Sequence, residues 1–258
     1  MIEIENAYIT RPGQLAGPFN SDDGIGISAN GEFLHVRNST VNFYGLPLGE
    51  KYQDEAAAVT WGASALFERC IFRGAGKLFL CGSGDRNRRA DEVGCQVTLR
   101  ECLLEGFGRR GPEVQCGMLC KMEDCAIVDW GTPNRFSVRS FGAWAHDGGE
   151  IIATNCAFIN IDRLTRWQRV ADHWHHFWQA ISDNGLRAIF DPLTYAAGWR
   201  RGLTASDTGS VEAIDCYASP GVIVQGQVGG MRMTEANALI ARLVNVCGPK
   251  DGTTQGEI

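Results

Sequence analysis

Four charged residues recur at related positions in this sequence. Asp23, Glu55 and Arg110 each lie 15 or 16 residues before the central residue of a short repeated segment. Lys77 opens the strand-like stretch KLFLC of an intervening repeat. If the repeats stack, two carboxylates and two cations share one edge of the molecule. Such an edge could be a solvated salt-bridge network, which contributes little to stability, or an active-site groove, and the alignment leaves both open.

The repeated segment that sets this spacing is a short strand with a small central residue, as in FERCIFRG, LRECLLEG, MEDCAIVD, ATNCAFIN and AIDCYASP. The central residues form a ladder with intervals of 32, 31, 32, 23, 31, 60 and 30 residues: Ala7, Ser39, Cys70, Cys102, Cys125, Cys156, Cys216 and Val246. Glycines recur eight positions upstream: Gly31, Gly62, Gly94, Gly117 and Gly148. This period is typical of a solenoid, and the short, Gly-punctuated segments indicate strands. We therefore predict an all-β fold, a parallel β-helix over residues 1–258 as a single domain.

The ladder cysteines are expected to be reduced thiols packed inside this coil. Successive turns of a parallel coil lie about 4.8 Å apart, so the same position in each turn forms a buried column that small polarizable side chains fill well. Ten cysteines in 258 residues is also far below the density of a disulfide scaffold. CGMLC is a CxxxC and lacks the paired CxxC spacing of a zinc site.

One stretch breaks the strand pattern. Apolar residues of LTRWQRVADHWHHFWQAI follow helical spacing, so we predict an α-helix near residues 163–181 within a helix-and-loop insertion over 163–202. Its three histidines, His173, His175 and His176, lack a carboxylate pattern that would complete a metal site. We expect the helix to pack its tryptophan side on the coil, where it could cover an open end or wall one side of a cleft.

Composition excludes several classes of partner. The formal net charge of −6 and the pI near 5.4 argue against a nucleic-acid partner. No apolar run approaches the roughly 20 residues of a membrane helix, and the N-terminal stretch does not read as a signal peptide. The expectation is a cytoplasmic protein as given, or a secreted one if a leader was removed. An uncapped coil end would expose strand edges, which could pair two copies into a dimer.

Two stretches resemble the pectate lyase family: FERCIFRGAGKLFLCGSGD and VTLRECLLEGFGRRGPEVQCG, the second with the family's RxP element at Arg110. The similarity runs from about Ile4 to Ile161. It implies a right-handed parallel β-helix and β-elimination from a uronate polymer. In that chemistry Arg110 takes the proton beside the substrate carboxylate, and Lys77 neutralises the carboxylate. Asp23 and Glu55 match two calcium-binding positions of the family.

The sequence also departs from the family pattern. Ser21 and Val59 stand at two further calcium positions, which leaves calcium binding open. Gln115 stands where the family has a substrate-binding arginine. Arg139 and Arg201 fall near the repeat offset of the same edge and could replace that arginine.

Three functions are compatible with these observations. The first is a pectate lyase-like enzyme acting on an acidic polysaccharide, which is favoured because Lys77 and Arg110 are both present. The second is an intracellular cyclase or isomerase of specialised metabolism that uses the same cleft for a small, less charged substrate. The third is a non-catalytic β-helix binding module, in which the aligned charges are only surface.

Overall fold

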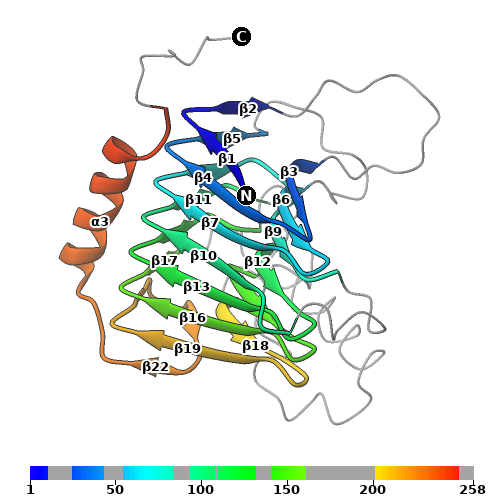
Figure 1. Ribbon diagram of the computed structural model, residues 1–258. Helices are drawn as coiled ribbons and strands as arrows, with labels where there is room; N and C mark the ends of the chain where they lie inside the picture. The colour runs from blue at the N-terminus through cyan, green and yellow to red at the C-terminus, as the bar shows by residue number, and fades with distance from the viewer. Residues whose placement is uncertain are drawn as a thin grey trace, which may run out of the picture.

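The computed structural model describes residues 1–10, 25–43, 55–83, 93–107, 110–131, 141–160 and 201–249. In these residues the chain winds into a coil of three parallel sheets, and a helix lies along one side (Figure 1). The first sheet contains β1 (Ile2–Glu5), β4 (Phe33–Arg37), β7 (Ser64–Glu68), β10 (Gln96–Arg100), β13 (Leu119–Glu123), β16 (Glu150–Thr154), β19 (Ser210–Ile214) and β22 (Gln227–Val228). The second contains β2 (Tyr8–Thr10), β5 (Thr40–Asn42), β8 (Ile71–Arg73), β11 (Leu103–Glu105), β14 (Ala126–Val128), β17 (Ala157–Ile159) and β20 (Tyr217–Ala218). The third contains β3 (Ile25–Asn30), β6 (Glu55–Thr60), β9 (Lys77–Cys81), β12 (Arg110–Val114), β15 (Ala143–Ala145), β18 (Arg201–Ala205) and β21 (Ile223–Val224).

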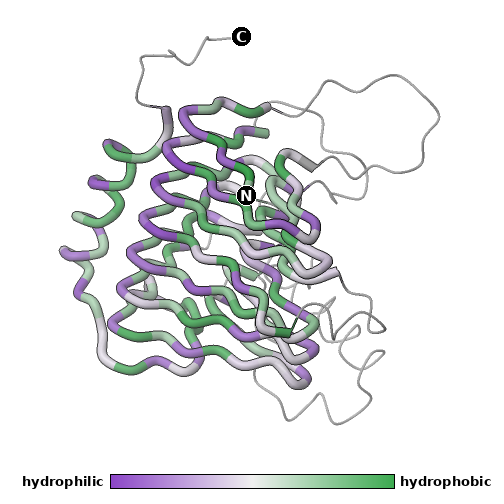
Figure 2. The backbone as a smooth tube through the Cα atoms, viewed as in Figure 1, coloured by the Kyte–Doolittle hydropathy of each residue, from purple (hydrophilic) through white to green (hydrophobic). Residues whose placement is uncertain are grey.

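Each turn of the coil visits the first, second and third sheet in that order before the next turn begins. Strands on neighbouring turns pair in parallel, with nearly the same register throughout each sheet. The predicted right-handed parallel β-helix is confirmed. Along the first sheet, buried and accessible positions alternate, as in β7 and β13, and Figure 2 shows the matching alternation of hydrophobic and hydrophilic residues.

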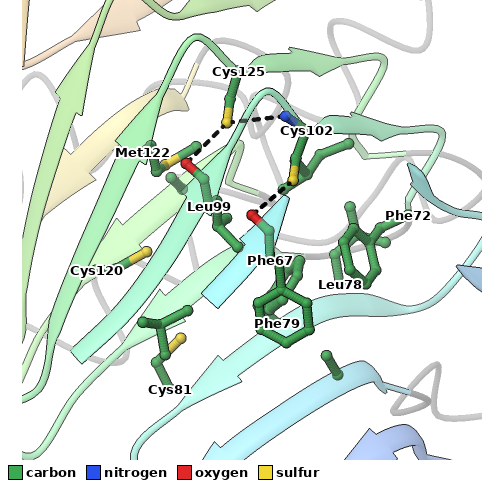
Figure 3. Packing of buried hydrophobic residues seen from close by; sticks show 14 of the residues in the cluster. Phe67, Phe72, Leu78, Phe79, Cys81, Leu99, Cys102, Cys120, Met122 and Cys125 are labelled. Carbon is green, nitrogen blue, oxygen red and sulfur yellow. Dashed lines mark hydrogen bonds between the residues drawn. The ribbon is translucent and has the colours of Figure 1, made fainter. Parts of the chain in front are cut away.

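The core fills the space between the three sheets. Phe67, Phe72 and Phe79 come from one turn, one from each sheet, and are fully buried. Their rings meet edge to face, with centroids 4.5 to 5.5 Å apart, a favourable geometry for aromatic pairs. Figure 3 shows these rings beside ladder cysteines of the following turns.

The ladder of small residues lies at the corner between the first and second sheets. The residue before each member has a positive φ: Asn6, Asn38, Arg69, Glu101, Asp124, Asn155 and Asp215. Asn and Asp adopt this left-handed conformation more readily than most residues, which explains their frequency at the corner. The turn then places the next side chain inside the coil.

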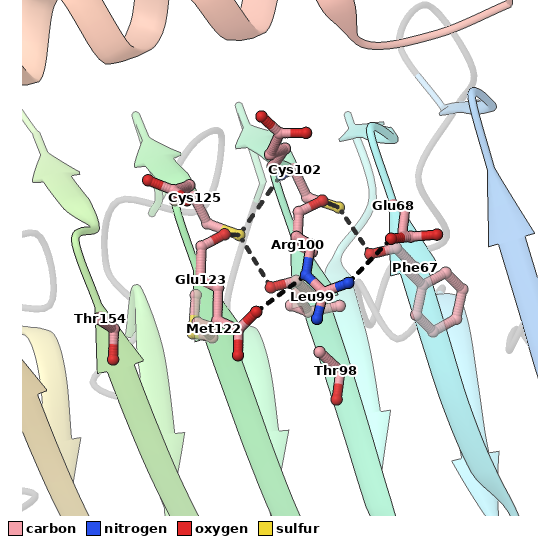
Figure 4. Close-up of polar contacts among 12 residues, drawn as sticks. Phe67, Glu68, Thr98, Leu99, Arg100, Cys102, Met122, Glu123, Cys125 and Thr154 are labelled. Atoms are coloured by element: carbon pink, nitrogen blue, oxygen red, sulfur yellow. Dashed lines mark hydrogen bonds and ion pairs between the residues drawn. The ribbon is translucent and has the colours of Figure 1, made fainter.

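The ladder cysteines are free, as predicted, and five of them are buried in this column: Cys70, Cys102, Cys125, Cys156 and Cys216. Each thiol contacts the carbonyl two residues earlier and a carbonyl of the turn before. For Cys125 these are the carbonyls of Glu123 and Leu99, both 3.3 Å from Sγ (Figure 4). Burial raises the pKa of the Cys102 thiol well above its ordinary value, which favours the unreactive protonated form.

The ladder ends at Cys216, one member earlier than the sequence predicts. Val246 is the last residue of α3 (Met233–Val246), not a rung of the coil. The spacing of the ladder continues numerically past β22, but there the chain leaves the coil and runs back along it. Ala236, Leu239 and Leu243 form the buried face of α3.

This face of α3 packs on the outer side of the second sheet, against Leu103, Ala126 and Ala157. Arg242 adds an ion pair to Glu101 at 3.0 Å. The helix therefore covers apolar side chains of the second sheet on several successive turns. The third sheet lies on a different side of the coil, and α3 does not cover it (Figure 1).

Several predicted features fall outside the described residues, namely the helix near 163–181, Asp23 and Arg139. The single-domain assignment of residues 1–258 also stays a prediction. β18 begins at Arg201, so the predicted insertion over 163–202 overlaps this strand by two residues. In the part of the chain that the structure describes, no helix is both long and apolar enough to cross a membrane.

Candidate active site on the third sheet

Three of the four charged residues predicted to align, Glu55, Lys77 and Arg110, lie at the edge where the third-sheet strands begin. Glu55 pairs with Lys77 and Lys77 pairs with Arg110, on three consecutive turns. The next two turns place Phe141 and then Arg201 in the same column. We call these five residues the edge column. Because parallel pairing keeps the register from turn to turn, side chains far apart in sequence are stacked one above the next.

Small residues directly follow the edge column and let the turns approach closely. Gly111, Gly142 and Gly202 come after Arg110, Phe141 and Arg201. A Cβ atom added to Gly111 would lie 1.7 Å from the carbonyl oxygen of Gly142, a distance that no side chain tolerates. The absence of a side chain here keeps the backbone of neighbouring turns in contact beneath the charged groups.

Two ion-paired clusters are built on this edge. In the first, Lys77 Nζ lies 2.9 Å from Glu55 Oε1. In the second, Glu113 Oε1 contacts both Arg110 Nη1 and His146 Nε2, the latter at 3.1 Å. The side chains of Arg110 and Glu113 are 10% and 5% exposed. Breaking a pair at this depth would leave an uncompensated buried charge.

Glu113 is ionised at neutral pH. Burial acts to raise its pKa, but the hydrogen bond with His146 and the charge of Arg110 outweigh burial and lower the pKa to about 2. Lys77 contributes in the same direction. Glu113 Oε2 is buried and has no hydrogen-bond partner among the described residues. A single carboxylate oxygen, Oε1, therefore contacts both the Arg110 guanidinium and the His146 ring.

An aromatic stack adjoins the second cluster. The Trp144 ring is stacked with Phe141, with centroids 4.8 Å apart, and with His146, with centroids 3.9 Å apart. Trp144 Nε1 donates a hydrogen bond to Ser206 Oγ at 3.0 Å. The Arg110 guanidinium lies 5.0 Å from the Trp144 ring centroid, within the range of a cation–π contact.

The remaining predicted residues are placed as follows. Gln115 is buried, and its amide donates to the carbonyl of Gly82 on the previous turn at 3.0 Å. Arg201 lies in the edge column, with its guanidinium 5.1 Å from the Phe141 ring centroid. Their roles in binding substrate stay predictions. Asp23 and Arg139 lie outside the described residues, so the calcium pair is represented by Glu55 alone, which is bonded to Lys77.

Glu113, Trp144 and His146 were not among the predicted site residues. The repeat carries the signal that could have found them. Positions 113 and 144, like 115 and 146, are one 31-residue turn apart. Stacking RGPEVQCG on FGAWAHDG therefore places Glu113 beside Trp144 and His146 two positions further along the same strand direction, beside Gln115.

Two solved structures of known enzymes share this architecture. One is a polygalacturonate lyase fused with a self-assembling amphipathic peptide. It is 15% identical over 95% of this chain and 61% of its own, with a TM-score of 0.57. The other is a thermostable pectate lyase, 13% identical over 96% of this chain and 61% of its own, with a TM-score of 0.54. The chain has the fold of the pectate lyases.

The extent of this similarity limits what it establishes. No family model and no curated protein matches the sequence. The chain spans about 61% of the length of the two pectate lyase structures. At this level of identity the pectate lyase likeness concerns the fold, so a function has to be argued from the site itself.

Proposed function

We propose that the protein is a lyase that cleaves a uronate polymer by β-elimination, with Lys77 and Arg110 acting on the substrate carboxylate. The observation that carries the proposal is the position of these two cations, side by side on consecutive turns of the third sheet. The names of the two similar structures, a polygalacturonate lyase and a pectate lyase, support the substrate class.

The chemistry requires fixed positive charge at one place. When the proton beside a uronate carboxylate is removed, negative charge develops on the carboxylate oxygens. Preorganised cations in a water-poor site stabilise that charge more in the transition state than in the ground state. Lys77 and Arg110 are mostly buried and fixed by Glu55 and Glu113, so little reorganisation is needed when charge appears.

The resemblance assigns the base to Arg110, and this assignment stays a prediction. Glu113 is ionised and contacts the Arg110 guanidinium, which is a permanent cation that can donate hydrogen bonds but not accept them. A charged guanidinium suits the carboxylate-binding role better than the removal of a proton.

The proposed reaction does not require calcium, and the activity assay compares calcium with a chelator. Among the described residues, no group of three or more His, Cys, Asp or Glu side chains could hold a metal ion. At Glu55 the carboxylate oxygen already accepts a hydrogen bond from Lys77. The described residues therefore do not form a calcium site by themselves, and no step of the proposed reaction uses the metal.

The test is the ultraviolet absorbance of the unsaturated product on polygalacturonate, pectin and alginate, each with calcium and with chelator. Wild type should release product, and Lys77→Ala and Arg110→Ala should each lose about 10²- to 10³-fold in kcat, as expected for removal of an electrostatic stabiliser. Arg110→Lys keeps the charge and controls for damage to the fold. Lys121→Ala and Arg100→Ala, on the first sheet, should retain full activity. Failure of wild type on all three polymers would overturn the proposal.

A second function is favoured by the aromatic stack. The stacked rings of Phe141, Trp144 and His146 place aromatic side chains beside Arg110, which is already ion-paired. This arrangement also suits a small, less charged substrate of a cyclase or isomerase. The two functions differ in a simple binding experiment, because oligogalacturonate should quench Trp144 fluorescence in a salt-dependent manner only if the site takes a polyanion.

A further inference from the structure

We infer that His146 is the proton acceptor of the site and that Glu113 is a positioning residue that holds its imidazole in the reactive tautomer. The inference deepens the proposed lyase function and rests on it for the identity of the proton donor. It follows from the arrangement of Glu113, His146 and Trp144 on neighbouring turns of the third sheet.

The hydrogen bond of the imidazole ring fixes which nitrogen carries the proton. His146 Nε2 lies 3.1 Å from Glu113 Oε1, and an ionised carboxylate can only accept a hydrogen bond. Nε2 therefore carries the proton, and in the neutral ring Nδ1 has a free lone pair. Within the described part of the chain, no hydrogen bond is made at Nδ1 of His146. The His146 side chain is 15% exposed and that of Glu113 is 5% exposed, so the imidazole is more open to a ligand than the carboxylate is.

The orientation of the ring is fixed by stacking as well as by this bond. Trp144 lies 3.9 Å from His146, with an interplanar angle of 22°. Trp144 is itself stacked on Phe141 and bonded to Ser206 at Nε1. A base that directly follows a strand, here β15, and packs on a fixed ring keeps one geometry, which a general base requires.

Charged groups surround His146. Glu113 supplies a buried negative charge in direct contact with the imidazole. Arg110 and Lys77, on β12 and β9, supply positive charge to the same carboxylate. The carboxylate is shared between Arg110 and His146 through one oxygen, Oε1. A group that binds the substrate carboxylate and a group that takes a proton are thus adjacent.

The reaction step balances as follows. His146 Nδ1 takes the proton from C5 of the uronate, and the electron pair left on C5 forms the C4–C5 double bond. The C4–O4 bond breaks, and the leaving oxygen takes a proton from water. His146 then returns its proton to solvent. Lys77 and Arg110 hold the carboxylate throughout, and no oxidant or reductant is needed.

The chain contains a matched control for this pair. His35 Nε2 lies 2.8 Å from Glu68 Oε2, which is the same pair of residue types on neighbouring turns of the first sheet. The pair lies apart from the edge column, and its two side chains are both 18% exposed. His35→Gln and Glu68→Gln therefore repeat the chemical change at a place that the proposed reaction does not use.

The first measurement is the tautomer of His146 by nitrogen-15 NMR of uniformly labelled protein, with the signal assigned by its loss in His146→Gln. We expect the neutral ring to be protonated at Nε2 and unprotonated at Nδ1, and Glu113→Gln to reduce that preference. A neutral ring protonated at Nδ1 would overturn the inference, whether or not any polymer is cleaved.

The second measurement is the pH dependence of kcat/KM on the uronate polymer that wild type cleaves. We expect His146→Gln to lower kcat by about 10²- to 10⁴-fold, the usual contribution of a general base, and to remove the rising limb of the profile. Glu113→Gln should lower kcat with little change in KM, because the imidazole is no longer held in the reactive tautomer. His35→Gln and Glu68→Gln should leave both rate and profile unchanged.

The outcomes separate the inference from the proposed function. If wild type cleaves no uronate polymer, the lyase proposal fails and the tautomer alone decides whether Glu113 and His146 form the inferred pair. If wild type is active but His146→Gln keeps its rate and its pH limb, the lyase proposal stands and the inference is wrong.

Discussion

Charged residues are stacked turn upon turn on two faces of the coil, and the two stacks differ in depth. On the first sheet Arg100 lies between Glu68 and Glu123, at 3.1 and 2.9 Å (Figure 4). Its side chain is 46% exposed. On the third sheet Arg110 contacts Glu113, and its side chain is 10% exposed. The residue types are alike. Arg100 bonds glutamates on the two neighbouring turns, whereas Arg110 and Glu113 lie on one strand, and the two sites differ in depth.

This difference shows that alignment alone does not mark a functional site in a β-helix. Parallel register stacks any charge that recurs with the repeat, so an ion-pair ladder forms wherever opposite signs alternate. Water and salt screen the exposed ladder, and each pair there contributes at most about 1 kcal/mol. Removing water from the third-sheet cluster strengthens every charge interaction in it, which is the condition for electrostatic catalysis.

The largest expected difference between the two faces is the cost of removing one arginine. Arg110→Met leaves the buried Glu113 carboxylate without its cation, and we expect it to lower the free energy of unfolding by about 3–5 kcal/mol. Arg100→Met should cost no more than about 1 kcal/mol. Urea denaturation of the two variants measures both. Similar costs for the two changes would mean that burial does not separate the faces.

A double variant tests the cause of that cost. If Arg110→Met is destabilising because Glu113 is left charged and buried, then Arg110→Met/Glu113→Leu should recover a large part of the loss. No recovery would instead assign the cost to lost packing of the Arg110 side chain.

The second difference is the response of stability to acid. The pKa of Glu113 is about 2 in the folded protein and near 4.3 in an unfolded chain. A lowered pKa stabilises the folded state above the unfolded pKa, and this contribution is lost as the pH falls from about 4.5 toward 2. Its size is about 3 kcal/mol, from roughly 1.4 kcal/mol per pKa unit.

Denaturant titrations at a series of pH values in this range would measure the acid effect, and Glu113→Gln should remove that part of the acid dependence. The pKa of Glu68 is also lowered, because the hydrogen bonds from His35 and Arg100 outweigh its partial burial. Its surroundings are wetter, so Glu68→Gln should leave most of the acid dependence in place. If Glu113→Gln and Glu68→Gln reduce the pH dependence of the unfolding free energy equally, the two faces do not differ in this respect.

The sequence predicts the coil well because stacking imposes the same requirement on every turn. A small residue after a left-handed residue recurs at each corner of the first and second sheets, and its period is visible without a structure. The end of the coil could not be predicted in this way. Val246 continues the numerical period, but α3 is set by the apolar spacing of Ala236, Leu239 and Leu243 and by packing on the second sheet.

The candidate site is predictable only in part. Glu55 and Arg110 align through the ladder, and the same 15-residue offset before Cys156 and Cys216 reaches Phe141 and Arg201. The partner of each charge does not follow from the period. Glu113 bonds Arg110 within one strand and His146 across turns, and this depends on side-chain conformation and burial, which a linear spacing does not contain.

The smallest expected effect is also the one that most directly tests the exposed ladder. Arg100→Ala removes a cation that bonds Glu68 and Glu123, and at low salt it should lower the free energy of unfolding by about 0.2–1 kcal/mol. At 1 M salt the Debye length falls to about 3 Å, so wild type and variant should become equally stable. The Arg110→Met cost should persist at the same salt concentration, because ions do not enter the buried cluster. A persistent cost for Arg100→Ala at high salt would mean that its side chain stabilises the first sheet by packing along the strands, and the contrast between the two faces would then be one of degree.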